Sequence, residues 1–163
     1  AGLGTPYPMR RDITPGDPPR ETDWVCGAIM LIRSDLWRRL HGFDPRFFLY
    51  WEETDFCKRA HEQGARIWAL GEAVCDHAAG ASAEQSGEQT ANRLVTAHYY
   101  RSRFYYLTKH HGYLAAATVD IVELVLLAMR AVLNILRRKR GRRSLRERLK
   151  APLLSLPAKI ENG

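Results

Sequence analysis

The sequence predicts an α/β domain followed by long C-terminal helices. Three features carry this prediction: a nearly continuous apolar run at 24–32, an aromatic run leading into acids and a helical pattern at 47–63, and a long apolar stretch at 113–136. Short apolar runs between turn residues are typical of buried strands, whereas longer periodic ones are typical of helices. With 163 residues and 45% hydrophobic content, the chain is long and apolar enough to bury a core.

Residues 1–23 are expected to form an exposed loop, because they are rich in proline and glycine and show no hydrophobic period. Residues 24–32 are expected to form a strand buried on both faces. Gly27 and Ala28 within it lack bulk, so a ligand or another backbone could approach there. Close packing beneath a helix explains the two small residues at least as well.

Two helices are predicted on either side of an aromatic strand. Ser34 is a suitable N-cap for a short helix over 35–40. The aromatic residues 47–51 form the expected strand, and a helical pattern follows at once. That second helix should end at Gly64, since glycine enters the left-handed backbone region without a Cβ clash.

Acidic residues cluster where the second helix is expected to begin. They are Glu52, Glu53 and Asp55, and Arg59 follows one turn later. The helix macrodipole and the unpaired backbone N–H groups favour negative charge at this end. On spacing alone, ordinary capping explains the acids better than catalysis does. Arg59 is placed to pair with Asp55 and hold the helix start.

The middle of the chain predicts two short strands and a helix. Residues 66–70 and 73–75 have β-type composition, and residues 83–87 are small and polar, as in loops. A helix is expected over 90–111, ended by Gly112. Its interleaved aromatic and arginine residues could stack on bases, but aromatic packing on a core is the commoner case.

Residues 113–136 are long enough to span a bilayer, yet they contain Asp120, Glu123, Arg130 and Asn134. A charged residue near a bilayer centre costs roughly 2.5–3.5 kcal/mol, which opposes a free span. The four polar residues fall on one narrow helical stripe. Such a helix suits the membrane interface or packing against other hydrophobic elements.

Positive charge is concentrated after this apolar stretch, although the whole chain carries a formal charge of +7. The basic residues are Arg137, Arg138, Lys139, Arg140, Arg142 and Arg143. Each basic residue near an anionic lipid surface contributes about 1 kcal/mol of attraction. A solvated basic tail and nucleic-acid binding are the alternatives, and the adjoining apolar helix favours the membrane surface.

Cysteine usage favours a reducing compartment. Cys26, Cys57 and Cys75 are odd in number and lack C-x-x-C spacing, which argues against a disulfide framework or a zinc knuckle. They are expected to be small buried hydrophobes. No signal peptide is visible, and the absence of a starting Met suggests a fragment.

Residues 41–60 resemble a signature of family 2 glycosyltransferases. The pattern is a Gly-Phe-Asp turn, an aromatic strand, an acidic pair, an Asp two residues later, an aromatic residue and an Arg. In the rhamnosyltransferase-like and galactofuranosyltransferase-like branches a strand pair and a His-x-x-Gly-x-Ser segment follow, as 77–82 do here. The resemblance implies that 24–112 are the C-terminal, acceptor-side half of a GT-A domain. Residues 113–143 would then be an amphipathic helix with a basic cluster, and 144–163 a tail.

The resemblance also implies roles for single residues. Glu53, the second acid of the pair, would be the general base, where many members carry Asp. His77 would be a ligand of a divalent cation, Mg²⁺ or Mn²⁺, although a lone His after a short strand is more often structural. Substrate-binding residues would be Trp51, Glu52, Asp55, Gly27 and Ala28, with core packing an equal alternative for Trp51.

The function implied is an inverting glycosyltransferase on the cytoplasmic, inner face of a bacterial membrane. It would transfer a sugar, with rhamnose suggested, from a nucleotide-sugar to a cell-surface glycan or polyprenyl-linked acceptor. No strand–helix repeats or Asp-x-Asp motif precede Trp24, so this chain alone is expected to be inactive. The alternative is a non-catalytic membrane-surface or protein-interaction module; nucleic acid is not an expected partner.

Overall fold

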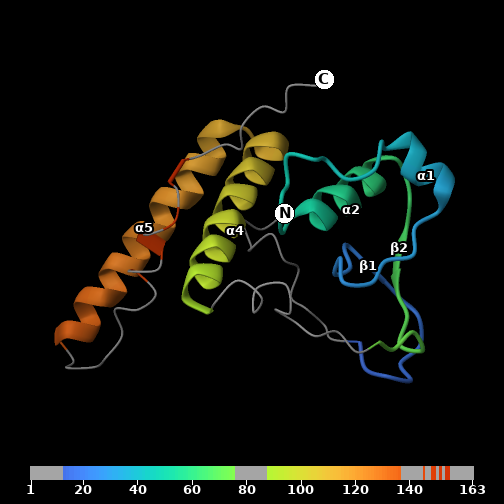
Figure 1. The fold of residues 1–163 in the computed structure, drawn as a ribbon, viewed down its shortest axis with the longest axis horizontal. Coiled ribbons are helices and arrows are strands. Elements are labelled where there is room, and N and C mark those ends of the chain that lie inside the picture. The colour runs from blue at the N-terminus through green and yellow to red at the C-terminus, as the bar shows by residue number, and fades with distance from the viewer. Residues whose placement is uncertain are drawn as a thin grey trace. The chain divides into compact units, whose positions relative to one another are not determined.

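The computed structural model describes residues 13–75 and 88–136, together with positions 145, 148, 149, 151, 153 and 154. The elements are, in order, β1 (Arg20–Thr22), α1 (Ser34–Arg39), α2 (Glu52–Glu62), β2 (Ile67–Ala69), α4 (Glu88–His111) and α5 (Tyr113–Leu136) (Figure 1). The chain divides into two compact units. The first comprises Ala1–Asp44 and Glu53–Ala78, and the second comprises Pro45–Glu52 and Ala79–Gly163.

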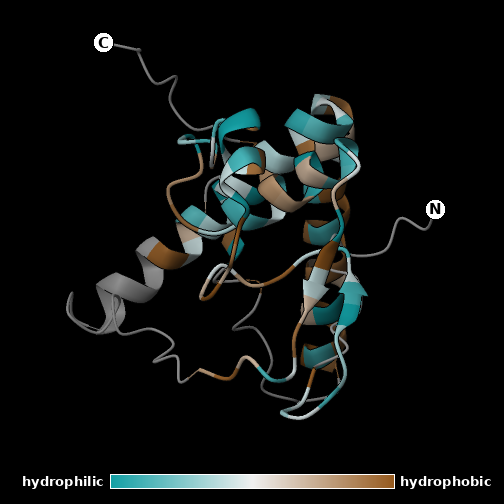
Figure 2. Cartoon of the chain, turned by 90° about the vertical axis from the view of Figure 1, so that its right-hand side faces the viewer, coloured by the Kyte–Doolittle hydropathy of each residue, from teal (hydrophilic) through white to brown (hydrophobic). Residues whose placement is uncertain are grey.

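The described part of the chain is mostly helical and contains one two-stranded sheet, rather than the larger sheet of the predicted α/β domain. In that sheet β1 pairs antiparallel with β2, Arg20 opposite Ala69 and Thr22 opposite Ile67. Figure 2 shows the two strands side by side, β1 hydrophilic and β2 more hydrophobic. The strand predicted at 66–70 is thus confirmed as β2.

The partner of β2 was not predicted. It lies within residues 1–23, which the sequence assigned to an exposed loop, whereas residues 73–75 form no strand. The Gly16 N–H donates to the Gly71 carbonyl at 3.1 Å, which ties the turn before β1 to the end of β2. A Cβ on Gly71 would lie 2.5 Å from the Asp17 carbonyl oxygen, so the approach of these two segments requires glycine.

The buried strand predicted at 24–32 is wrong. The segment is irregular and turns at Gly27 and Ala28, and Leu31 is completely exposed while Ile29 is 57% exposed. A strand buried on both faces needs neighbouring strands to satisfy its N–H and C=O groups. The described residues offer only the β1–β2 pair, so the apolar composition of 24–32 is not sufficient to form a strand.

The aromatic strand predicted at 47–51 is also wrong. Tyr50 and Trp51 have φ of 64° and 75°, in the left-handed region, which a continuous strand does not tolerate. The chain therefore turns sharply and enters α2 directly at Glu52.

The helix predictions hold better. α2 begins at the acids and ends before Gly64, whose φ of 74° is left-handed as expected, and α4 ends at Gly112 with φ 87°. α5 has the predicted bounds. Ser34 does not act as the N-cap of α1: Arg33 holds that position, and no side chain caps the helix.

Each unit has an aromatic core of its own. In the first, the rings of Trp37, Phe43 and Phe56 pack with centroids 5.1–5.6 Å apart. In the second, Phe47 packs on Tyr105 at 4.8 Å and the Ser102 hydroxyl donates to the Leu49 carbonyl at 2.9 Å, which fixes the loop before α2 onto α4. Aromatic pairs in this range add to the stabilisation from burial alone.

α4 and α5 form a helical hairpin in which only Gly112 separates them, and they lie side by side (Figure 1). None of the helices in the described part of the chain is long and apolar enough to cross a membrane. The basic cluster at 137–143 and the loop at 83–87 lie outside the described residues. Of the cysteines, only Cys57 is buried; Cys26 and Cys75 are exposed, against expectation, because the segments that carry them are irregular rather than buried strands.

Candidate functional site around helix α2

One face of α2 is covered by the loop that precedes α1. Glu53, Cys57 and His61 are four residues apart and therefore share that face. The His61 Nε2 atom lies 3.1 Å from the Asp23 carbonyl, and Gly27 lies over Glu53. The loop thus runs along two turns of the helix, and its backbone contacts the residue predicted to be the general base.

Glu53 is 9% exposed and packs against Gly27. A Cβ on Gly27 would lie 3.4 Å from the Glu53 Cβ, an ordinary van der Waals distance, so this segment packs closely on α2 without requiring glycine. Ala28 is exposed in the turn. The catalytic role of Glu53 and ligand binding at Gly27 and Ala28 stay predictions.

Asp55 is completely buried and is paired within its own helix. Arg59 Nε donates to Asp55 Oδ2 at 2.7 Å. The same guanidinium donates to the Leu40 carbonyl at 2.8 Å and to the Gly42 carbonyl at 2.9 Å. Arg59 therefore fastens the Gly-Phe-Asp turn to the first turn of α2, and Asp55 holds Arg59 in place.

The turn itself depends on glycine. Gly42 has φ 68°, and a Cβ there would lie 2.7 Å from Trp37 Cζ2. The preceding residue, His41, also has a left-handed φ of 57°. The Arg59 contacts therefore hold a backbone conformation that few sequences adopt.

The residues just before Glu53 are also buried to different degrees. Burial raises the pKa of Glu52, whose Oε2 atom makes no hydrogen bond within the described residues. Trp51 is fully buried, with its ring against Tyr99 at 6.0 Å and Tyr106 at 5.1 Å. The structure therefore shows Trp51 as a packing residue, and contact with a sugar ring at Trp51 stays a prediction.

Two residues of the segment 47–51 have exposed aromatic rings that the sequence analysis did not single out as substrate-binding. Phe48 is 77% exposed and its ring lies 4.6 Å from that of His98, and Tyr50 is 39% exposed beside Tyr99. Which aromatic residue of 47–51 would be buried depends on the left-handed turn at Tyr50 and Trp51. No local sequence signal reveals it, because strand alternation does not apply to a turn.

The predicted metal ligand His77 lies outside the described residues. Among the residues that are described, no group of three or more His, Cys, Asp or Glu side chains could hold a metal ion. The acids of α2 do not make such a group, and Asp55 is turned to Arg59.

Comparisons with known proteins place this site in context. The chain is 28% identical to an N-acetylglucosaminyl-diphospho-decaprenol L-rhamnosyltransferase of Mycobacterium tuberculosis over 132 residues, which is 80% of this chain and 40% of that protein. It is 40% identical to the rhamnosyltransferase WbbL of Escherichia coli over 45 residues, 28% of this chain and 17% of that protein.

The chain therefore spans less than half the length of the curated relatives it matches. No family model matches it, and no solved structure matches it. The acidic signature around α2 and these two relatives agree: the chain is a distant relative of bacterial rhamnosyltransferases and resembles the family 2 glycosyltransferases.

Proposed function

We propose that this chain supplies the acceptor-side part of an inverting sugar transferase, with Glu53 as general base. The observation that carries the proposal is the arrangement at the start of α2, together with the similarity to rhamnosyltransferases. Arg59 fixes the helix start to the preceding turn through Asp55 and two carbonyls. A base held on a rigid helix start keeps its reach and orientation through the reaction.

The chemistry needs one proton acceptor. The acceptor hydroxyl gives its proton to the Glu53 carboxylate while its oxygen forms a bond to the anomeric carbon of the donor. The bond from that carbon to the nucleotide diphosphate breaks, and the diphosphate leaves with the bonding electrons. A positioned general base of this kind accelerates a reaction by about 10²–10⁴-fold.

The substrate classes follow from the relatives. The Mycobacterium tuberculosis relative is an N-acetylglucosaminyl-diphospho-decaprenol L-rhamnosyltransferase. For this chain we propose a nucleotide-activated sugar, with rhamnose the leading candidate, as donor and a polyprenyl-diphosphate-linked sugar as acceptor. Asp55 supports the acceptor site by holding Arg59 at the helix start, and Glu52 contacts the acceptor sugar.

A divalent cation remains part of the proposal only through His77. The described residues do not form a metal site by themselves, so no step above depends on one. A calorimetric titration with Mn²⁺ tests the role of His77. The proposal expects His77→Ala to weaken Mn²⁺ binding at least about tenfold; equal affinities would remove His77 as a ligand.

The decisive experiment on the base compares two acid-to-amide substitutions on the same helix, in the longest natural protein that contains this chain. Glu53→Gln should lower kcat by about 10²–10⁴-fold, with donor binding retained. The matched control is Glu62→Gln, at the far end of α2, where Glu62 pairs with Lys58 at 2.7 Å on the surface. Near-normal turnover of Glu53→Gln would exclude Glu53 as the base.

A further inference from the structure

α5 turns its two acids inward and exposes most of its large apolar side chains. The residues turned inward lie on one face of the helix at spacings of three, four or one residue. They are Ala116, Asp120, Glu123, Leu124, Leu127, Ala131 and Asn134. Asp120 is only 2% exposed, so the acids of the polar stripe seen in the sequence face protein, whereas Arg130 at its edge is exposed.

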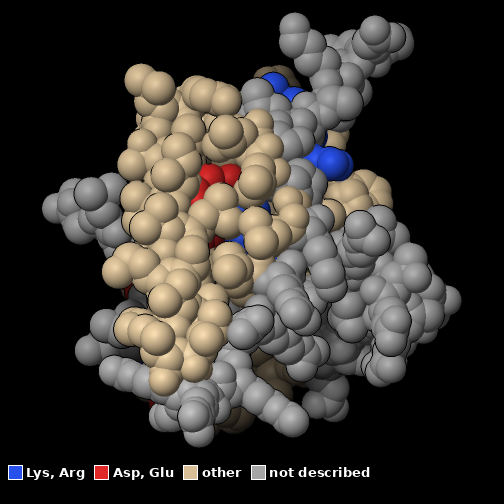
Figure 3. Space-filling view, turned by 90° about the vertical axis from the view of Figure 1, so that its left-hand side faces the viewer, with Lys and Arg blue, Asp and Glu red and all other residues tan. Residues whose placement is uncertain are grey.

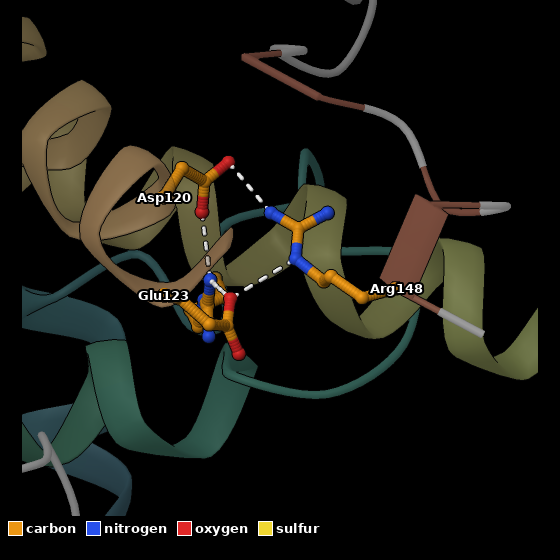
Figure 4. Close-up of polar contacts among 4 residues, drawn as sticks. Asp120, Glu123 and Arg148 are labelled. Atoms are coloured by element: carbon orange, nitrogen blue, oxygen red, sulfur yellow. Dashed lines mark hydrogen bonds and ion pairs between the residues drawn. The ribbon is translucent and has the colours of Figure 1, made fainter. Parts of the chain in front are cut away.

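An ionic cluster makes this inward orientation possible. Arg103 of α4 contacts Asp120 at 2.7 Å and Glu123 at 2.6 Å, and Arg148 contacts the same acids at 2.9 and 3.0 Å (Figure 4). Two arginines thus balance two carboxylates in a buried setting. Burial alone would raise the pKa of Glu123, but hydrogen bonds from Arg103 and Arg148 outweigh it and the pKa is lowered.

The opposite face of α5 is mostly apolar, with Thr118 as an exposed polar residue whose hydroxyl donates to the Leu114 carbonyl. Exposed large side chains on it are Leu114, Val119, Ile121, Val122, Val125, Leu126, Met129, Val132, Leu133, Ile135 and Leu136. Leu126 and Met129 in the middle are 59% and 57% exposed. Figure 3 shows this side of the molecule, where the described residues are mostly neither acidic nor basic and a small acidic area lies near the centre of the view. A continuous exposed apolar face of this kind marks an interaction surface.

We propose that α5 lies flat on an anionic lipid surface, with this apolar face toward the acyl chains. The basic run at 137–143 directly follows the helix in the sequence and would meet the lipid head groups. A helix of 24 residues is about 36 Å long, so α5 offers a long line of contact parallel to the surface. This inference depends on α5 and the basic run that follows it in the sequence, and not on the proposed sugar transfer.

Charge favours lipid over a second copy of the chain as the occupant. Each copy carries a formal charge of +7 and the same basic run beside α5. Two such copies would repel each other through these charges, whereas an anionic membrane attracts them. Asp120 and Glu123 of α5 face inward and are already paired with arginines. Docking the outer face of α5 on lipid would therefore bury no charged residue of the helix except Arg130, which lies at the edge of that face.

The test is co-sedimentation of the 163-residue chain with vesicles of phosphatidylcholine alone or with phosphatidylserine added. Binding is expected to require the anionic lipid and to weaken with salt. The double variant Leu126→Gln/Met129→Gln should bind at least about tenfold more weakly. Replacing Arg137, Arg138 and Arg140 with Gln should weaken binding on the order of a hundredfold.

The matched control is Leu31→Gln, because Leu31 is a fully exposed leucine in the other unit. It should bind vesicles as the unchanged chain does, and circular dichroism should show equal helix content in all variants. Equal binding to neutral vesicles, or unchanged binding of the Leu126→Gln/Met129→Gln variant, overturns the proposal. A dimer that only this variant disrupts would also overturn it, by showing that a second copy covers the face.

Discussion

α2 and α5 each bury an aspartate, but they neutralise it in different ways. Asp55 is paired by Arg59 of the same helix, whereas Asp120 is paired by Arg103 of α4 and by Arg148. α2 can therefore bury its apolar residues Phe56, Cys57 and Ala60 beside its acid. In α5 the inward face holds Asp120 and Glu123, which pair with arginines from outside the helix, together with alanines and the half-buried Leu124 and Leu127. Most of the large apolar residues of α5 face outward.

The difference shows that apolar content alone does not decide which side of a helix faces the protein. An in-helix ion pair needs one side chain four residues away. A pair between elements needs those elements to be close, and it then fixes their packing. An arginine–aspartate ion pair thus fixes the local geometry of the candidate site in α2, whereas in α5 such pairs fix the orientation of the whole helix.

The largest expected effect comes from removing the arginine of each helix's pair. Arg59→Ala should destabilise the chain by about 3–5 kcal/mol, because Asp55 is left buried without its partner arginine. Arg103→Ala should cost less, about 2 kcal/mol, because Asp120 and Glu123 keep Arg148. Urea unfolding followed by tryptophan fluorescence measures both.

Arg130→Ala is the control for this pair of variants, since Arg130 lies on α5 and is exposed. Its effect should stay within about 0.5 kcal/mol. Equal losses of unfolding free energy for Arg59→Ala and Arg103→Ala would contradict the comparison. They would show that Arg148 alone does not compensate for the loss of Arg103.

The next effect concerns the turn that Arg59 holds. Gly42→Ala should cost about 3 kcal/mol, since it combines left-handed backbone strain with a Cβ 2.7 Å from the Trp37 ring. Gly64→Ala has a similar φ of 74° but nothing within 4 Å, so it should cost only about 1 kcal/mol. The difference between the two midpoints in urea isolates the steric contact, and equal midpoints would show that the Trp37 ring moves freely aside.

The smallest effect is a pair of opposite pH dependences. Burial raises the pKa of Glu52 above its ordinary 4.5, so the cost of its charge appears as pH rises through the folded pKa. The pKa of Glu123 is lowered, because the hydrogen bonds from Arg103 and Arg148 outweigh burial. Its contribution to stability is present above pH 4.5 and is lost as pH falls through the folded pKa.

At pH 7 Glu52→Gln should therefore raise the melting temperature by about 1–3 °C, and Glu123→Gln should lower it by at least that much. Once pH has fallen below the folded pKa of each group, its variant should melt close to the unchanged chain. Thermal melts in a series of decreasing pH from pH 7 measure the differences, and shifts of the same sign at pH 7 would contradict the electrostatic account.

Local patterns predicted the helices and their ends well. Left-handed glycines follow α2 and α4 where expected, and the apolar length of α5 matches its bounds. These features follow from backbone sterics and periodicity, which neighbouring residues determine. The acids at the start of α2 were foreseen for the same reason, and the resemblance to glycosyltransferases rested on them.

The strands were predicted poorly, since a strand is defined by a partner that can lie far away in the sequence. The apolar run at 24–32 forms none, whereas the polar residues of β1 pair with β2. The degree of burial of Glu53 and Trp51 also depends on which loop or helix covers them. Composition carries no information on that choice.

By itself the sequence determined the helical segments, the acidic start of α2 and the stripe of polar residues along α5, because these depend on spacing within one element. Only the tertiary structure decided that the acids of this stripe face inward. The reason is that Arg103 and Arg148, from separate parts of the chain, reach Asp120 and Glu123 together. Charges buried in protein must be paired, and the pairing turns the apolar face of α5 outward.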